Sequence, residues 1–390
     1  MKYFCEFRID SIYTKNWFVI RCGLIGLLSL FLSSVLLAHT YYIDATSGND
    51  SNDGRSVLTA WKTLTKVNGI TFVAGDTILL KSGSTWTGQL KPNGSGTSGN
   101  PIIIDKYNGT TKPIVNGNGV TGQGTVYLSD QQYWEINNLE ITNNAATAGD
   151  RRGVLIEASN FGLAQHIYLK NLDIHNVKGT VGQDDAAKRT AGIGFEVTAD
   201  ATPTRFDDIL IDGCNIYQIE NTGIYTDNTV VRNDYPHTSG WNSRRFTNVR
   251  ISNNVIHHIS KNAMIIRLFD HGIIEHNGCY ETATATTGNT MFTATCDSTI
   301  FQYNEGYLNR SPDADGSMYD ADLRSPNTVW QYSYSHDNAH GLFWTCTVQE
   351  DSGVVCRYNI SQNDQGIIFC INYPSTSVYC YNNTVYTASN

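Results

Sequence analysis

The chain has 390 residues, of which 40% are hydrophobic and only 16% are charged, so it can bury a large core. Its formal net charge is −9 at pH 7, and so acidic a surface argues against nucleic acid as a partner. Aromatic residues make up 11% of the chain, with 22 Tyr, which suits strands and turns that face a polar, sugar-like partner.

Residues 1–38 read as a leader. Basic residues precede an uninterrupted apolar run at 22–38, which predicts a signal peptide cleaved near Ala38. Cleavage would take the net charge to −11, because the leader carries four basic and two acidic residues. The alternative is an uncleaved anchor, since the run is only slightly shorter than a bilayer span requires. We expect a single domain at 39–390 in a protein that is secreted, extracellular or periplasmic. If the leader is cleaved, the protein should not contact a membrane; if the leader is not cleaved, the protein should be attached to the cell surface.

One helix and two short strands are predicted next. Trp61, Leu64 and Val67 recur at helical spacing, which predicts an amphipathic helix over 59–68. Its expected role is to cover the open end of a solenoid. Short β runs at 76–80 and 101–105, bounded by Gly, Ser and Asn, predict the first strands.

Several strings of this chain resemble a known family. They include YYIDATSGNDSNDGRS at 41–56, AWKTLTKVN at 60–68 and IYLKNLDIHNV at 167–177. The likeness is to secreted bacterial right-handed parallel β-helix proteins of the pectate-lyase-like superfamily, and it covers essentially the whole chain after the leader. The resemblance implies fold and export but no single reaction, because that superfamily holds polysaccharide lyases, glycoside hydrolases, epimerases and non-catalytic adhesins.

From about residue 136 one figure recurs: an apolar or aromatic residue, usually an Asn three positions later, and a His or Tyr six positions after the start. The copies begin at Ile136, Leu169, Ile211, Ile251, Ile274, Phe301, Trp330, Cys356 and Tyr379. A repeat of this length without helical patterning predicts a solenoid with one coil of strands per repeat. Together with the resemblance it predicts an all-β, right-handed parallel β-helix. The Asn residues are expected in left-handed turns and in a hydrogen-bonded column, and the rings in a structural stack.

Two insertions interrupt the coil spacing, at 179–189 and 229–245. Long loops in a tight solenoid are expected to rim a binding face. The second insertion contains Trp241 and Arg244, which suit stacking on sugar rings and pairing with carboxylates. The alternative is a disordered surface loop.

The second strand of each coil carries the first candidate catalytic groups. An apolar column is predicted to point inward at Ile193, Ile224, Met264, Met291, Met318, Leu342 and Ile367. Alternation then turns Glu196, Asp227 and Arg267 outward on three successive coils. The same face is expected to carry sugar platforms at Tyr225, Tyr319 and Phe343. Because coils lie about 4.8 Å apart, these carboxylates have the spacing of a glycosidase pair. An exposed salt-bridge ladder is the alternative.

Asp320 and Asp322 complicate this alignment. Taken literally it buries both carboxylates, which would be very costly. We therefore predict a one-residue slip or bulge in this coil, which turns both outward, close to Asp313 and Asp315. Four acids in ten residues suggest a catalytic carboxyl pair or a calcium site, and no loop motif decides between them.

These carboxylates favour a carbohydrate-active enzyme that cleaves a polysaccharide, with glycoside hydrolysis slightly ahead. One alternative is a calcium-dependent lyase acting on a uronate polymer, with Lys261 or Arg267 as base. The other is a non-catalytic, glycan-binding adhesin. Calcium is the one cofactor that the sequence suggests, and the sequence does not identify its ligands. Neither the substrate nor the linkage follows from the sequence.

Seven cysteines follow the leader. Cys356 and Cys380 are one coil apart, as are Cys346 and Cys370, so we expect thiols stacked in the core as small hydrophobes. The last repeat starts at Tyr379 and only a few residues follow it. A solenoid that stops there exposes strand edges, so we expect either a longer natural chain or self-association.

Overall fold

The structure is a computed structural model that describes residues 37–231, 233–345, 352–372 and 377–388, so the predicted leader lies outside the described residues. Contacts divide the chain after Leu37, and the account below concerns the unit Ala38–Asn390. Within the described residues, no helix is both long and apolar enough to cross a bilayer.

Nearly all strands belong to three parallel sheets, which the chain visits in turn. Among the described residues the first sheet contains, in spatial order, β1 (Thr40–Ile43), β3 (Thr77–Lys81), β6 (Ile102–Tyr107), β9 (Trp134–Asn137), β12 (Leu163–Lys170), β15 (Arg205–Asp212), β18 (Phe246–Ser252), β22 (Ile273–Glu275), β25 (Ile300–Gln302), β28 (Val329–Gln331), β31 (Ser352–Arg357) and β34 (Ser377–Tyr381), with β21 (Phe269–Asp270) beside β18. The second contains β4 (Thr85–Thr87), β7 (Ile114–Asn116), β10 (Glu140–Asn143), β13 (Asp173–Val177), β16 (Asn215–Ile219), β19 (Val255–Ile259), β23 (Gly278–Tyr280), β26 (Glu305–Tyr307), β29 (Tyr334–His336), β32 (Ile360–Gln362) and β35 (Thr384–Tyr386).

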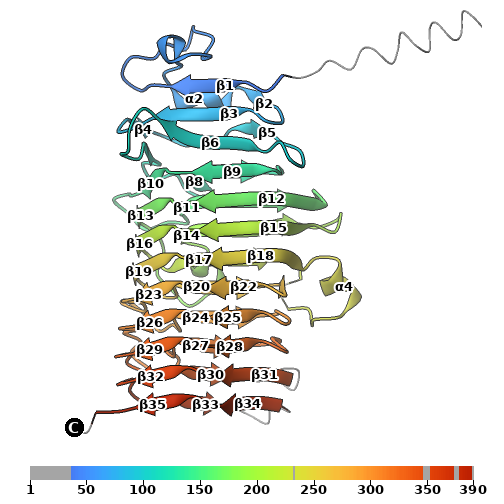
Figure 1. Cartoon of the computed structure of the whole chain (residues 1–390), viewed down its shortest axis with the longest axis vertical. Helices are drawn as coiled ribbons and strands as arrows, with labels where there is room; N and C mark the ends of the chain where they lie inside the picture. Colours follow the sequence, from blue (N-terminus) through green and yellow to red (C-terminus); the bar gives the residue numbers. More distant parts are fainter. Residues whose placement is uncertain (1–36, 232, 346–351, 373–376, 389–390) are drawn as a thin grey trace, which may run out of the picture. The chain divides into compact units, whose positions relative to one another are not determined.

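The third sheet contains β8 (Gly124–Ser129), β11 (Arg152–Ser159), β14 (Ala191–Ala199), β17 (Thr222–Asn228), β20 (Met264–Arg267), β24 (Met291–Ala294), β27 (Tyr319–Ala321), β30 (Phe343–Thr345) and β33 (Phe369–Ile371). A short pair, β2 (Thr71–Phe72) and β5 (Asn93–Gly94), stands apart. One coil is therefore a strand from each sheet, as in β12, β13 and β14, and the next coil stacks on it in parallel (Figure 1). The predicted all-β, right-handed parallel β-helix is confirmed.

The N-terminal cap is less regular than predicted. A 3₁₀ turn, η1 (Val57–Thr59), precedes α2 (Leu64–Asn68), which starts at Leu64 because the Thr63 side chain accepts a hydrogen bond from Lys66 N. Trp61, expected in the helix, instead makes a parallel bridge with Ile43. A single helix over 59–68 was therefore wrong in extent. Leu64 and Val67 nevertheless pack on the core, as a capping element requires.

The repeat starts form one inward row in the first sheet. Ile136 pairs with Leu169, and the register continues coil by coil to Trp330 and Cys356. In the last coil the partner of Cys356 is Cys380, so the predicted start at Tyr379 was one residue early. The expected register of Cys356 and Cys380 is confirmed and both are free thiols, but only Cys356 is buried: Cys380 is exposed, so its predicted place in the core is wrong. Cys346 lies outside the described residues.

The predicted Asn column is confirmed, with a corrected backbone. Asn277 Nδ2 donates to Asn304 Oδ1 at 3.0 Å, and Asn277 Oδ1 in turn accepts from Asn254 Nδ2 at 2.9 Å. The left-handed residue of each turn is the one before the column, such as His276 (φ 55°) and Tyr303 (φ 55°), and not the Asn itself. The column therefore owes its Asn residues to hydrogen bonding across coils.

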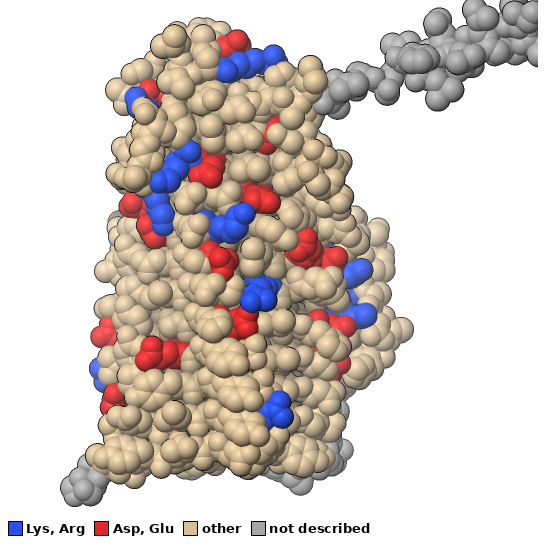
Figure 2. Space-filling model, in the orientation of Figure 1, with Lys and Arg blue, Asp and Glu red and all other residues tan. Residues whose placement is uncertain are grey.

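The predicted ring column is structural, as expected. His175, Tyr217, His257, Tyr280, Tyr307 and His336 stack with centroids 4.6–5.0 Å apart and nearly parallel planes. On the face seen in Figure 2, acidic and basic side chains are interspersed.

Candidate active site

The outer face of the third sheet brings together the first three predicted groups. Glu196 and Asp227 are register partners on β14 and β17, and Arg267 Nη1 on β20 lies 3.7 Å from Asp227 Oδ2. The predicted outward ladder of two acids and one arginine therefore exists, because each residue stands an odd number of positions, three, after a residue of the inward column.

The first insertion covers this ladder instead of rimming it. Its helix α3 (Asp185–Lys188) begins at an N-cap, Asp184, whose side chain accepts from Ala187 N. Arg267 Nη2 lies 3.1 Å from Asp185 Oδ1, which attaches the insertion to β20. Glu196 is left 2% exposed and Asp227 0%. The prediction that these two carboxylates face an open groove is wrong, because a loop that sequence spacing placed at the rim folds across the strands.

Glu196 lies instead in a buried ion-pair network. Arg152 Nη2 is 3.5 Å from Glu196 Oε2, Arg189 Nε is 2.9 Å from Oε1, and the Tyr225 hydroxyl donates to Oε2 at 3.0 Å. Burial raises the pKa of Glu196 despite these two cations. Tyr225 is 1% exposed and packs against Ile265, so its predicted role as a sugar platform is wrong.

The predicted slip at Asp320 is confirmed. Tyr319, not Met318, pairs with Met291, so Asp320 falls beside Phe292 on the outer face of β27. The slip persists in the next coil, where Phe343 pairs with Tyr319. Tyr319 and Phe343 consequently point inward and are 0% exposed, so both predicted platforms are wrong: they are core residues.

The slip places three carboxyl groups around a pocket of about 90 Å³, the carboxyl pocket. It is lined by Asp315, Asp320 and Asp322 together with Gln183, Lys188, Lys261, Asn262, Gly288, Asn289 and Phe292. The turns before β20 and β24, the strand β27 with the residues beside it, and the first insertion thus all contribute to one small, polar site.

Asn289 fixes two of these carboxyl groups. Its Nδ2 donates to Asp315 Oδ1 at 2.7 Å and to Asp320 Oδ2 at 2.8 Å, while its Oδ1 accepts from Ser317 N. Because one nitrogen contacts both, the Asp315 and Asp320 carboxylate oxygens lie within about 5.5 Å of each other. Asn262 Nδ2 donates to the Asn289 carbonyl and holds the clamp.

Burial and neighbouring charges shift the pKa values of three groups that line the carboxyl pocket. Burial raises the pKa of Asp322, and the like charge of Asp315 adds to it, while Lys188 and Arg267 oppose the rise. Burial also lowers the pKa of Lys188, with Arg267 as the next cause. The pKa of Lys261 falls to about 8 through burial and the neighbouring Lys188. Proton donors and acceptors with displaced pKa values are what acid–base catalysis requires.

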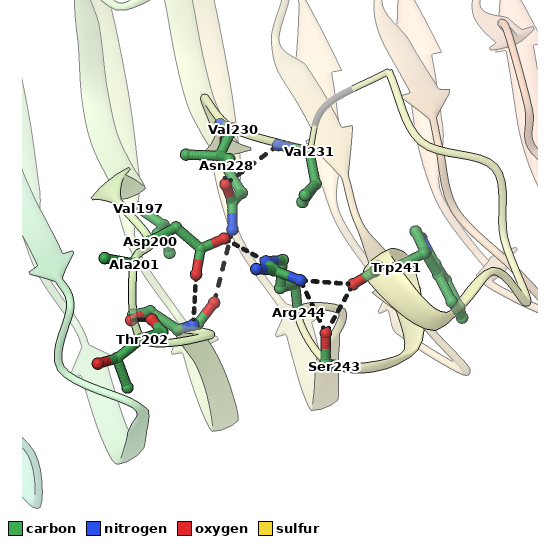
Figure 3. Close-up of polar contacts among 12 residues, drawn as sticks. Val197, Asp200, Ala201, Thr202, Asn228, Val230, Val231, Trp241, Ser243 and Arg244 are labelled. Atoms are coloured by element: carbon green, nitrogen blue, oxygen red, sulfur yellow. Dashed lines mark hydrogen bonds and ion pairs between the residues drawn. The ribbon is translucent and has the colours of Figure 1, made fainter.

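The second insertion is anchored by the residues predicted to bind sugar. Trp241, in α4 (Ser239–Asn242), is 1% exposed, and its Nε1 donates to Thr295 O at 2.8 Å. Figure 3 shows the Arg244 guanidinium directed at Asp200 and Ser243, with which it forms an ion pair and a hydrogen bond. The predicted substrate contacts of Trp241 and Arg244 are therefore wrong, because these side chains hold the loop onto the solenoid.

The alternative of a calcium site finds no ligand set in the part of the chain described. No three His, Cys, Asp or Glu side chains there are grouped so as to hold a metal ion. Asp313 instead accepts a hydrogen bond from the Thr287 hydroxyl.

Sequence reasoning missed several pocket residues, among them Lys188 and Asn289. Lys188 was missed because it belongs to the first insertion, and the spacing of the repeats does not predict where an insertion folds. Asn289 did carry a signal: Asn262 and Asn289 each stand two positions before a residue of the inward Met column, Met264 and Met291. An Asn repeated at that offset marks a polar turn at the edge of the third sheet.

Comparisons with known proteins place this fold. No family model matches the chain. The chain is 29% identical to a lacto-N-biosidase of Bifidobacterium longum subsp. longum over an alignment that is 440 positions long, gaps included. The alignment covers 89% of this chain but 27% of that protein. The chain thus spans little more than a quarter of this curated relative.

Two solved structures show the same architecture. The GH136 lacto-N-biosidase from Eubacterium ramulus aligns with a TM-score of 0.79 at 22% identity, covering 96% of this chain and 70% of that one. Pectate lyase Pel9A aligns with a TM-score of 0.51 at 15% identity, covering 90% of this chain and 79% of that one. The chain therefore shares the parallel β-helix fold of these two structures.

Proposed function

We propose that this protein is a secreted glycoside hydrolase that cleaves an extracellular glycan in the carboxyl pocket. The observation that carries the proposal is the convergence of Asp315, Asp320 and Asp322, held by Asn289, in one small pocket. The likeness to a lacto-N-biosidase over 89% of the chain favours hydrolysis, and a glycan that ends in lacto-N-biose, as the substrate.

Asp320, in β27, and Asp322, just after it, have different catalytic roles in this proposal. Asp322, whose pKa is raised, is the general acid that protonates the glycosidic oxygen. Asp320 is 3% exposed and accepts a hydrogen bond from the Asn289 amide. It serves as the nucleophile or general base. The Asn289 clamp keeps Asp320 oriented toward the pocket.

A direct assay tests this function. The protein is incubated with oligosaccharides that end in lacto-N-biose and with a panel of polysaccharides, and the products are separated by chromatography. Release of lacto-N-biose, or of new reducing ends without an unsaturated product, supports hydrolysis. Glycan binding without cleavage at any pH would instead support the adhesin alternative and contradict the proposal.

One observation favours a second candidate, a polysaccharide lyase. Lys261 lines the pocket with a pKa near 8, as a base that removes a proton next to a uronate carboxyl would require. Its ammonium, however, donates to Gln183 Oε1 and to the Thr287 carbonyl, which occupy it. An unsaturated, ultraviolet-absorbing product from a uronate polymer would select the lyase.

Replacing Lys188 by Met tests the acid assignment through pH. The Lys188 charge lowers the pKa of Asp322, so the variant raises that pKa further. An acid must be protonated to act, and activity is lost as the pH rises through its pKa. The alkaline limb of kcat/KM is therefore expected to move to higher pH in Lys188→Met and to stay in place in Lys188→Arg. An alkaline limb that moves to lower pH, or moves equally in both variants, would contradict this role.

A further inference from the structure

The second insertion presents an aromatic side chain that its anchors do not use. Trp241 packs on Val231 and Leu268, and Arg245 Nε lies 2.5 Å from Asp270 Oδ2 in β21, so two sets of contacts fix the base of the loop. Tyr235, at the tip, remains 40% exposed. A ring held out on a fixed loop loses little conformational freedom when a ligand binds it.

The tip forms one wall of a second pocket, of about 230 Å³. Tyr235, Pro236 and His237 line it on one side, and Pro326 and Asn327 on the other. Asp297 joins the two sides: its Oδ2 lies 3.5 Å from His237 Nε2, and its Oδ1 accepts from Asn327 Nδ2 at 2.9 Å. The pocket is therefore built by contacts that span two segments of the chain.

Its chemistry suits a sugar ring. Tyr235 and the two prolines offer flat apolar surfaces for the C–H face of a pyranose, and the exposed His237 ring offers hydrogen bonds to hydroxyl groups. The Arg324 guanidinium lies 4.9 Å from the Tyr235 ring centroid and holds that ring in place.

Arg324 also ties this pocket to the carboxyl pocket. It follows Asp322 by two residues, so the two Cα atoms are at most about 7 Å apart. We propose that the Tyr235 pocket is a binding subsite for a further sugar unit of the same glycan whose glycosidic bond lies at Asp320 and Asp322. The assignment rests on the proposed function for the identity of that glycan. Its occupant is a neutral sugar residue beyond the cleaved bond, and it sets preference for substrate length.

The test separates binding from turnover. Binding of neutral oligosaccharides of graded length, all ending in lacto-N-biose, is measured by calorimetry on Asp320→Asn and on the double variant Asp320→Asn, Tyr235→Ala. We expect Tyr235→Ala to weaken binding about tenfold for the longer oligosaccharides, the loss growing with length, as removal of one aromatic stacking contact predicts. Tyr235→Phe keeps the ring and should bind as the parent does.

Tyr332→Ala is the matched control, because Tyr332 is 43% exposed on a turn of the solenoid and stacks only on neighbouring Tyr rings. It should leave binding unchanged at every length. Equal binding by the Tyr235→Ala and Tyr332→Ala variants at all lengths would overturn the subsite, even where the wild-type protein hydrolyses these glycans. Length-dependent loss in Tyr235→Ala would uphold it, even where wild-type turnover is absent and the proposed function fails.

Discussion

Replacing Asp320 by Asn is expected to lower kcat by about 10²–10⁴-fold with little change in folding. The side chain is 3% exposed and receives the Asn289 amide, and Asn has nearly the same shape. An amide can act neither as nucleophile nor as base, so the loss falls on the chemical step. The measurement is kcat on a lacto-N-biose-terminated substrate, with the thermal unfolding midpoint as the check on structure.

Asp322→Asn should lose activity for a different reason and is therefore diagnostic. Without the acid, the leaving group departs unprotonated, so aryl glycosides with an acidic phenol should be cleaved far better than natural glycans. Asp320→Asn should show no such recovery. Asp313→Asn is the control, because Asp313 is exposed in the same turn and contacts Thr287 outside the pocket lining. Full activity in both Asp320→Asn and Asp322→Asn would remove the carboxyl pocket as the catalytic site.

The solenoid could be predicted because each coil repeats the same requirements. An inward residue in the first sheet, such as Ile251, must be apolar, and the Asn three positions later, Asn254, bonds to the coils on both sides. Such demands recur at every coil and are visible in one sequence. Register within a coil follows from period-two alternation, which is why the slip at Asp320 could be inferred from the cost of burying a carboxylate.

The site could be predicted only in part, for two physical reasons. A slip moves every later residue of its strand to the other face, so recognising it for Asp320 but not for Tyr319 and Phe343 left two core residues assigned to the surface. An insertion carries no periodicity, so where it folds depends on contacts such as Arg267 with Asp185. That contact attaches the first insertion across the strands, and only the folded chain reveals it.

The Asn column makes a strong prediction about stability. Asn277 is 1% exposed, and its Nδ2 donates to the Ile251 carbonyl and to Asn304 Oδ1, both at 3.0 Å. Its Oδ1 accepts from the backbone N and the Nδ2 of Asn254. Truncation to Ala removes all four bonds and leaves their partners without water in the core. Each buried group left unpaired costs about 1–3 kcal/mol.

We therefore expect Asn277→Ala to lower the free energy of unfolding by about 3–5 kcal/mol, which is a change of a hundredfold or more in the folding equilibrium. Denaturant titration followed by both circular dichroism and Tyr and Trp fluorescence measures it, because two probes reveal whether coils near the substitution unfold separately from the rest. Asn144→Ala, at an exposed Asn that bonds only to the adjacent Ala145 N, should change stability by less than about 0.5 kcal/mol. Similar midpoints for the two variants would mean that coil stacking, and not the Asn column, supplies the registry of the solenoid.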